Sequence, residues 1–353
     1  LLTRVLADGI RFLATALIIN ILTGWDLQLS ILLIGFITLI YSAYGGIKTI
    51  IKIDAIQFFI YLIGGILTIL FILKHNPLIK LGHFIFEKEF FNLNYVSFLT
   101  DGNFIVSAII GGAFFGFASH GVDYMMVQRV LSTKNLKSAQ KAMIGSGIFV
   151  FIQFFIFMLI GFLIREIIPE DLPVDQEFAS FILLKMPTML KTLLTIGVLS
   201  AAMSTLSSSI NSLASSTLTD WFGKKNVSVK QSMIISIFWA FVLIGIASIF
   251  NENNTGLVYI GLKIASYTYG SLLGLFLLAK INLPFRPSDV IFSSITSIFL
   301  IFVLFLYQIA WTWWVIIGAL TIVIISTLLF YITKIDNKGS KENIIYFNFS
   351  FKT

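Results

Sequence analysis

The chain has 353 residues, of which 58% are hydrophobic and 12% charged, with no cysteine and a formal net charge of +7. A soluble globular domain does not need so much apolar surface, so we predict a polytopic membrane protein, and the absence of cysteine excludes disulfides and thiolate metal sites. The positive charge does not indicate nucleic-acid binding, because the lysines and arginines gather in alternate loops between apolar segments, as in other membrane proteins.

The first apolar segment, residues 1–25, carries three charged residues at helical spacing. Arg4, Asp8 and Arg11 follow one another at intervals of four and three residues, so they share one face of the predicted helix. Charged side chains inside a membrane normally pair with one another or face a cavity. Two interpretations are open: the cluster fixes the packing of the helix, or Arg11 lies near a bound solute.

Two further spans, residues 27–44 and 53–73, are separated by a predicted loop that contains Lys48 and Lys52. Asp54 stands at the start of the second span. Taken alone, this position is typical of a helix N-cap, where the carboxylate accepts hydrogen bonds from backbone N–H groups at the membrane boundary.

A glycine-rich span, residues 104–130, follows a long polar loop. Its glycines include Gly111, Gly112, Gly116 and Gly121. Such a series is typical of close helix packing, or of a transporter helix that unwinds partway and presents backbone groups to a substrate.

The span at residues 189–222 is exceptional because it places many hydroxyl groups in a membrane segment. Neutral oxygens in a low-dielectric site suit a hard cation of low charge, such as sodium. The alternative is that small residues allow close helix packing and that the hydroxyls bond back to their own helix. Residues that recur every three or four positions, and so share one helical face, are Ala201, Ser204, Thr205, Ser208, Ser212 and Ser215, with Ser207 and Asn211 at its edge.

The remaining apolar segments complete a predicted set of about ten transmembrane helices, the first of them incomplete. If the loop with Lys48 and Lys52 is cytoplasmic, most basic residues and the C-terminus lie on that side. Lys263 is an isolated charge within one span; it either extends toward the membrane surface or holds an anionic solute group. These segments are residues 142–164, 232–250, 256–279, 290–307 and 311–332.

Three stretches resemble the solute:sodium symporter family in the order that the family shows, namely residues 44–57, 121–132 and 201–212. The resemblance implies an all-α helical bundle with a LeuT-like inverted repeat. Residues 1–280 would form a partial transporter core, from the end of core helix 3 to core helix 10, without the first two core helices. Residues 281–335 would form two accessory transmembrane helices, and residues 336–353 a short cytoplasmic tail.

The resemblance also implies two sodium sites. In the main site, sodium would be bound by the carbonyl of Ala201 and the hydroxyls of Ser204 and Thr205. In a second site, the carboxylate of Asp54 would act with the hydroxyls of Ser207 and Ser208. The resemblance thus favours an ion-binding role for Asp54 over the N-cap interpretation.

For the solute, the resemblance points to Gly116 and Ser119 on core helix 6, to Lys263 on core helix 10, and to Arg11. Gly116 stands where the sugar transporters of the family have an asparagine that contacts the sugar, and Ser119 begins a pair that replaces two aromatic residues. These differences argue against a sugar, and the charge of Lys263 would suit an anionic solute.

We therefore predict a sodium-coupled symporter in the plasma membrane that imports a small organic solute by alternating access. Na+ is the expected coupling ion, and the solute and the lipid bilayer are the expected partners, with no role for nucleic acid. We predict no enzymatic activity, because the spans carry no paired carboxylates, zinc motif or Ser/His/Asp arrangement at useful spacing. The alternative is a membrane sensor domain of the same fold that does not transport.

Overall fold

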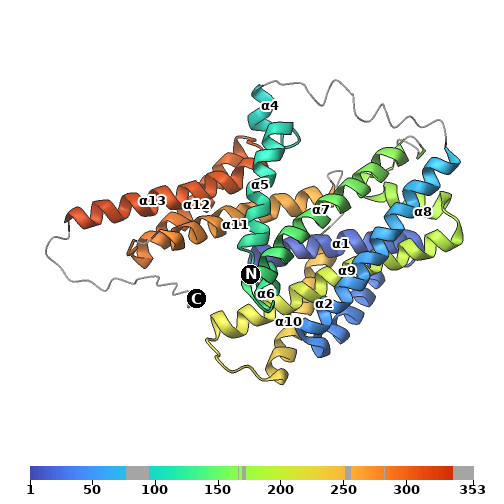
Figure 1. Ribbon diagram of the computed structural model, residues 1–353, viewed down its shortest axis with the longest axis horizontal. Coiled ribbons are helices and arrows are strands. Elements are labelled where there is room, and N and C mark those ends of the chain that lie inside the picture. Colours follow the sequence, from blue (N-terminus) through green and yellow to red (C-terminus); the bar gives the residue numbers. More distant parts are fainter. Residues whose placement is uncertain (77–94, 166, 169–171, 251–255, 282, 337–353) are drawn as a thin grey trace. The chain divides into compact units, whose positions relative to one another are not determined.

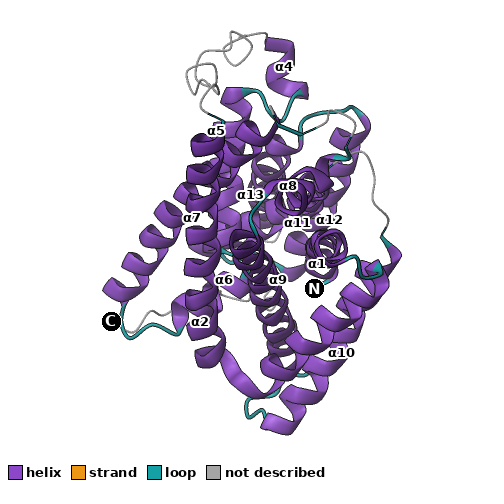
Figure 2. Cartoon of the chain, turned by 90° about the vertical axis from the view of Figure 1, so that its right-hand side faces the viewer, coloured by secondary structure: helices purple, strands orange, loops and turns teal. Residues whose placement is uncertain are grey.

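The part of the chain that the structure describes consists of helices joined by loops and contains no strand (Figure 2). Nine helices of that part are long and apolar enough to cross a membrane, and Leu27–Ile40 is a shorter apolar helix. The prediction of an all-α polytopic protein with about ten membrane segments is therefore confirmed. This computed structural model describes residues 1–76, 95–165, 167–168, 172–250, 256–281 and 283–336.

The chain divides into two compact units, which we describe separately (Figure 1). Unit 1 holds the described residues of Leu1–Phe86 and Gln128–Leu262, and unit 2 those of Glu87–Val127 and Lys263–Thr353. The division into a core at residues 1–280 and accessory helices at 281–335 stays a prediction, and the predicted tail lies, after Asp336, outside the described residues.

The hydroxyl-rich helix α9 lies at the centre of unit 1. It packs along α2 and also contacts α1 and α10. Half of its membrane span is buried, compared with 22% of the span formed by α7. The main helices of this unit are α1 (Leu2–Thr23), α2 (Leu27–His75), α7 (Leu136–Arg165), α8 (Glu177–Lys185), α9 (Thr188–Ser216) and α10 (Val229–Ile249).

The ends of these helices follow local capping rules. Asp26 begins α2, since its Oδ1 accepts hydrogen bonds from the backbone N–H groups of Gln28 (2.9 Å) and Leu29 (3.3 Å). Ser228 and Gln231 form a capping box at the start of α10. Helix α1 ends at Gly24, whose φ of 74° favours glycine and whose N–H donates to the carbonyl of Asn20.

The predicted loop around Lys48 and Lys52 is wrong, because α2 continues without a break from Leu27 to His75. Glycines in this region lower helix propensity but do not forbid a helix. A straight helix of this length would measure about 73 Å, which is more than twice the thickness of the hydrocarbon core. One membrane crossing cannot contain the whole helix, so we treat its two apolar parts, Leu27–Ile40 and Ile50–His75, as two membrane segments. Asp54 lies inside the helix, so its N-cap interpretation is also wrong.

Unit 2 contains α4 (Tyr95–Thr100), α5 (Ile105–Gly121), α12 (Pro287–Leu306), α13 (Trp314–Asp336) and most of α11 (Leu257–Lys280). Helices α12 and α13 pack side by side (Figure 1).

Helix α11 approaches α13 closely at two glycines. A Cβ atom on Gly270 would lie 3.0 Å from the carbonyl oxygen of Trp314, and one on Gly274 would lie 3.0 Å from that of Ala319. The four-residue spacing of these glycines is the pattern that lets membrane helices pack backbone against backbone.

The glycine-rich span is interrupted at the last glycine of the predicted series. Helix α5 is continuous through Gly111, Gly112 and Gly116 and ends at Gly121, and the break lies at Val122 and Asp123, before the short helix α6 (Tyr124–Leu131).

Asp123 stabilises this break. Its Oδ1 accepts a hydrogen bond from the N–H of Met125 (3.0 Å), and its Oδ2 accepts one from the hydroxyl of Tyr269 (2.7 Å). The N–H groups of Val122 and Asp123 both donate to the carbonyl of Ala118. The carboxylate of Asp123 therefore caps the start of α6, two residues after Gly121 ends α5.

Candidate functional site

One turn of α9 carries the residues predicted for the main sodium site. The Thr205 hydroxyl donates a hydrogen bond to the carbonyl oxygen of Ala201 at 3.2 Å. The hydroxyls of Ser207 and Ser208 donate to the carbonyl of Ser204, at 3.1 and 2.8 Å. Each hydroxyl oxygen keeps lone pairs for a further partner. Because Ala201, Ser204 and Thr205 are partly exposed while Ser207 and Ser208 are buried, the open part of this oxygen-rich turn is the part predicted to bind sodium.

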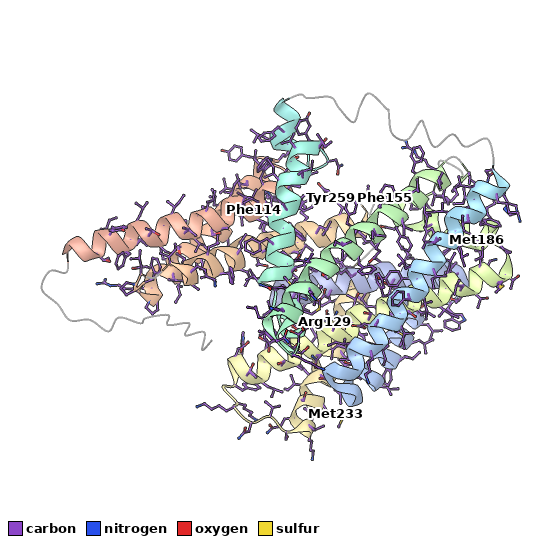
Figure 3. The ribbon with its side chains drawn as sticks, in the orientation of Figure 1. Phe114, Arg129, Phe155, Met186, Met233 and Tyr259 are labelled. Atoms are coloured by element: carbon purple, nitrogen blue, oxygen red, sulfur yellow. The ribbon has the colours of Figure 1, made fainter. Side chains whose placement is uncertain are left out.

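Asp54 of α2 and Ser208 of α9 come together through a third residue, Arg129, which is labelled in Figure 3. The Arg129 guanidinium donates to Asp54 Oδ2 at 2.6 Å and also to the Ser208 hydroxyl. The side chains of Arg129 and Asp54 are 29% and 13% exposed. The structure therefore brings together Asp54 and Ser208, two residues predicted for the second sodium site, and places a fixed positive charge between them.

Two oxygens of α2 remain unsatisfied beside this contact. Asp54 Oδ1 and Gln57 Oε1 are buried, and neither has a hydrogen-bond partner among the described residues. A buried acceptor without a donor costs free energy, and such oxygens are the ligands that a hard cation prefers. Gln57 is not among the predicted site residues, although a polar residue three positions after Asp54, on the same helical face of an apolar span, is a usable signal.

The atoms near α9 that could bind a metal ion are oxygens. The part of the chain that the structure describes holds no group of three or more His, Cys, Asp or Glu residues that could bind a metal ion. A cation at α9 would therefore be held mainly by hydroxyl, carbonyl and amide oxygens around the single carboxylate of Asp54. This donor set suits sodium better than zinc or another transition metal.

The charged cluster of α1 is an ion-pair network. Asp8 is fully buried and contacts Arg4 Nε at 2.6 Å and Arg11 Nη1 at 3.0 Å. It also accepts a hydrogen bond from the hydroxyl of Ser209 on α9. These contacts support the packing interpretation for Asp8, because they tie α1 to the central helix. The Arg11 side chain is 36% exposed, and its predicted contact with a solute stays a prediction.

The predicted solute residues of unit 2 occupy two different environments. The Lys263 ammonium lies 4.9 Å from the ring centroid of Phe305 and 5.8 Å from that of Trp314, so cation–π attraction to α12 and α13 stabilises it. The Ser119 hydroxyl donates to the carbonyl of Gly116 at 3.2 Å near the end of α5. A Cβ atom on Gly116 would meet nothing within 4 Å. The roles of Lys263, Ser119 and Gly116 in solute binding stay predictions.

Known proteins similar to this chain are transporters. Residues 1–282 match the family model described as Sodium:solute symporter family. The sodium-dependent multivitamin transporter of Oryctolagus cuniculus is 28% identical over 320 residues, which cover 83% of this chain and 49% of the relative. The sodium-coupled monocarboxylate transporter 1 of Mus musculus is 27% identical over 308 residues, with coverage of 80% and 49%. The chain thus spans about half the length of these curated relatives.

A solved structure shares the fold. It is described as the substrate-bound outward-open state of a Na+-coupled sialic acid symporter with a novel Na+ site, and it matches with a TM-score of 0.76 at 20% identity. The match covers 94% of this chain and 72% of the other. The helical arrangement is therefore that of a LeuT-like symporter, as the sequence predicts.

Proposed function

Since the chain belongs to the sodium:solute symporter family, we propose that it forms part of a sodium-coupled symporter that imports a small organic solute across the plasma membrane by alternating access. The observation that carries this proposal is the oxygen-rich turn at Ala201, Ser204 and Thr205, which lies partly open within the central helix of unit 1. The matched relatives are sodium-dependent transporters by name, which favours transport over a sensor domain and over an enzyme. The distribution of basic residues between the membrane segments favours a cytoplasmic C-terminus.

The main sodium site is formed by the Ala201 carbonyl with the hydroxyls of Ser204 and Thr205. The Thr205 hydroxyl already points toward the Ala201 carbonyl, since it donates to that oxygen at 3.2 Å. If this hydroxyl rotates, its lone pairs and the released carbonyl can both face a cation. The low dielectric of the buried helix strengthens the interaction of these dipoles with one positive charge.

Replacing Thr205 by alanine tests this site. The change preserves the helix but removes one sodium ligand, so the sodium concentration for half-maximal uptake should rise about tenfold, equivalent to ~1.4 kcal/mol. The measurement is sodium-dependent uptake by the full-length transporter in proteoliposomes. Ser212→Ala is the matched control, because Ser212 lies further along the same face and is buried. An equal change in both variants would show that the hydroxyl face serves helix packing alone.

A second sodium ion binds at Asp54 with Ser207 and Ser208, and Gln57 adds an amide oxygen. Neutral hydroxyls alone would hold a partly dehydrated cation weakly, whereas one carboxylate neutralises its charge. Two buried oxygens without hydrogen-bond donors, Asp54 Oδ1 and Gln57 Oε1, support the placement of a cation here.

The solute carries an anionic group, because the charged residue of unit 2 that is proposed to contact it, Lys263, is positive, and its predicted companions Gly116 and Ser119 are neutral. Uptake of labelled monocarboxylates, sialic acids, amino acids and sugars by the full-length transporter, with sodium and with choline, tests this. Sodium-dependent uptake confined to anionic solutes is the expected result, and uptake of a neutral sugar alone would contradict it.

A further inference from the structure

Arg129, near the end of α6, forms a hydrogen bond to the side of α9 that carries the hydroxyl groups. Its guanidinium donates hydrogen bonds to Asp54 Oδ2 of α2 at 2.6 Å and to the hydroxyl of Ser208 on α9. Beside it, the Asn211 amide of α9 donates to Gln128 Oε1 at 3.3 Å. Two consecutive residues of α6 therefore hold this end of the helix against α9, and Arg129 also holds it against α2.

The oxygens that bind Arg129 are those assigned to the second sodium ion. A guanidinium is always charged in proteins, so it neutralises Asp54 as a sodium ion would. Two positive charges beside one carboxylate in a partly buried site repel each other strongly. Arg129 and sodium are thus alternative occupants of the site.

The unsatisfied oxygens show how the exchange can begin. Arg129 uses Asp54 Oδ2, whereas Asp54 Oδ1 and Gln57 Oε1 are buried and have no hydrogen-bond partner among the described residues. A sodium ion that contacts Oδ1 draws electron density from the carboxylate and weakens its bond to the guanidinium. The Arg129 side chain is 29% exposed, so it has room to move once it is released.

We propose that Arg129 is a tethered cation that closes the second sodium site and is displaced when sodium binds there. This inference rests on the proposed sodium site at Asp54. It gives Arg129 two effects: it lowers the apparent affinity for sodium, and it couples sodium occupancy to the release of this end of α6. Arg129 is a positioning residue, since it would contact neither the bound sodium nor the solute.

The test is Arg129→Gln in the full-length transporter, with sodium-dependent uptake as the readout. Loss of the competing cation should lower the sodium concentration for half-maximal uptake by about tenfold, while the Hill coefficient stays above one. Arg129→Lys keeps the charge and should remain close to the unmutated protein. A higher or unchanged half-maximal concentration in Arg129→Gln would overturn the proposal, since a purely structural ion pair predicts no gain in affinity.

A second measurement needs no mutation. Addition of sodium to the unmutated transporter should increase hydrogen exchange at the amides of α6, relative to choline, because the helix end is released. Unchanged or slower exchange there would contradict displacement. Asp54→Asn distinguishes failure of the proposed second sodium site from failure of the proposed displacement of Arg129. If Asp54→Asn leaves the sodium Hill coefficient unchanged, the second site is absent. If Asp54→Asn lowers the coefficient but Arg129→Gln does not raise sodium affinity, sodium binds at Asp54 without displacing Arg129.

Discussion

Replacing Asp54 by asparagine should lower the Hill coefficient for sodium from above one toward one while some uptake remains. Asparagine keeps the size of the side chain but removes the charge that neutralises the second ion. Each sodium ion carried inward contributes about 2.3 kcal/mol per 100 mV of membrane potential. Loss of one ion should therefore reduce the attainable solute gradient by more than tenfold.

The control for this variant is Asp26→Asn. Asp26 also belongs to α2, but it is exposed and only caps the start of the helix, a role that asparagine also fills. Uptake curves and the ratio of charge to solute moved should be unchanged in Asp26→Asn. A Hill coefficient of one in the unmutated transporter, with charge movement for a single sodium per solute, would refute the second site.

Replacing Asp8 by alanine should destabilise the protein by about 3–5 kcal/mol. The change removes the buried carboxylate that contacts the guanidinium groups of Arg4 and Arg11 and the hydroxyl of Ser209. Two positive charges would then lie close together in the membrane segment without their common partner. Thermal unfolding of the purified transporter in detergent measures the loss.

Asp220→Ala is the matched control for Asp8→Ala. Asp220 is exposed and accepts hydrogen bonds only within its own turn, from the hydroxyls of Ser216 and Thr219. Its replacement should change stability by no more than about 0.5 kcal/mol. If the two variants unfold at the same temperature, the α1 network does not stabilise the packing against α9.

The helical periodicity of the sequence was sufficient to predict the membrane helices and the face of α9 that carries the hydroxyl groups. The apolar spans and the hydroxyl face of α9 follow from helical spacing alone, and both are present in the structure. The position of the break between α5 and α6 does not follow from spacing. Gly111, Gly112 and Gly116 lie inside α5, and of the four predicted glycines Gly121 alone adjoins the break, where Asp123 accepts hydrogen bonds from Met125 and Tyr269.

The contacts around Asp54 depend on tertiary structure. Spacing predicted that Ser204, Ser207 and Ser208 lie close together, because they belong to one helix. It could not predict Arg129, because the distance from Arg129 to Asp54 and Ser208 is set by the packing of three separate helices. Gln57 lies between these cases: its face could be predicted from the sequence, but the lack of a hydrogen-bond donor for its amide oxygen could not.

The glycine contact between α11 and α13 has a mechanical consequence. With the backbones of the two helices in contact at Gly270 and Gly274, no flexible side chain separates them to absorb a tilt. If α11 rotates, we expect α13 to turn with it, and α12, which packs on α13, to follow. A probe attached to α13 would therefore report the angle of α11, 44% of whose membrane span is buried.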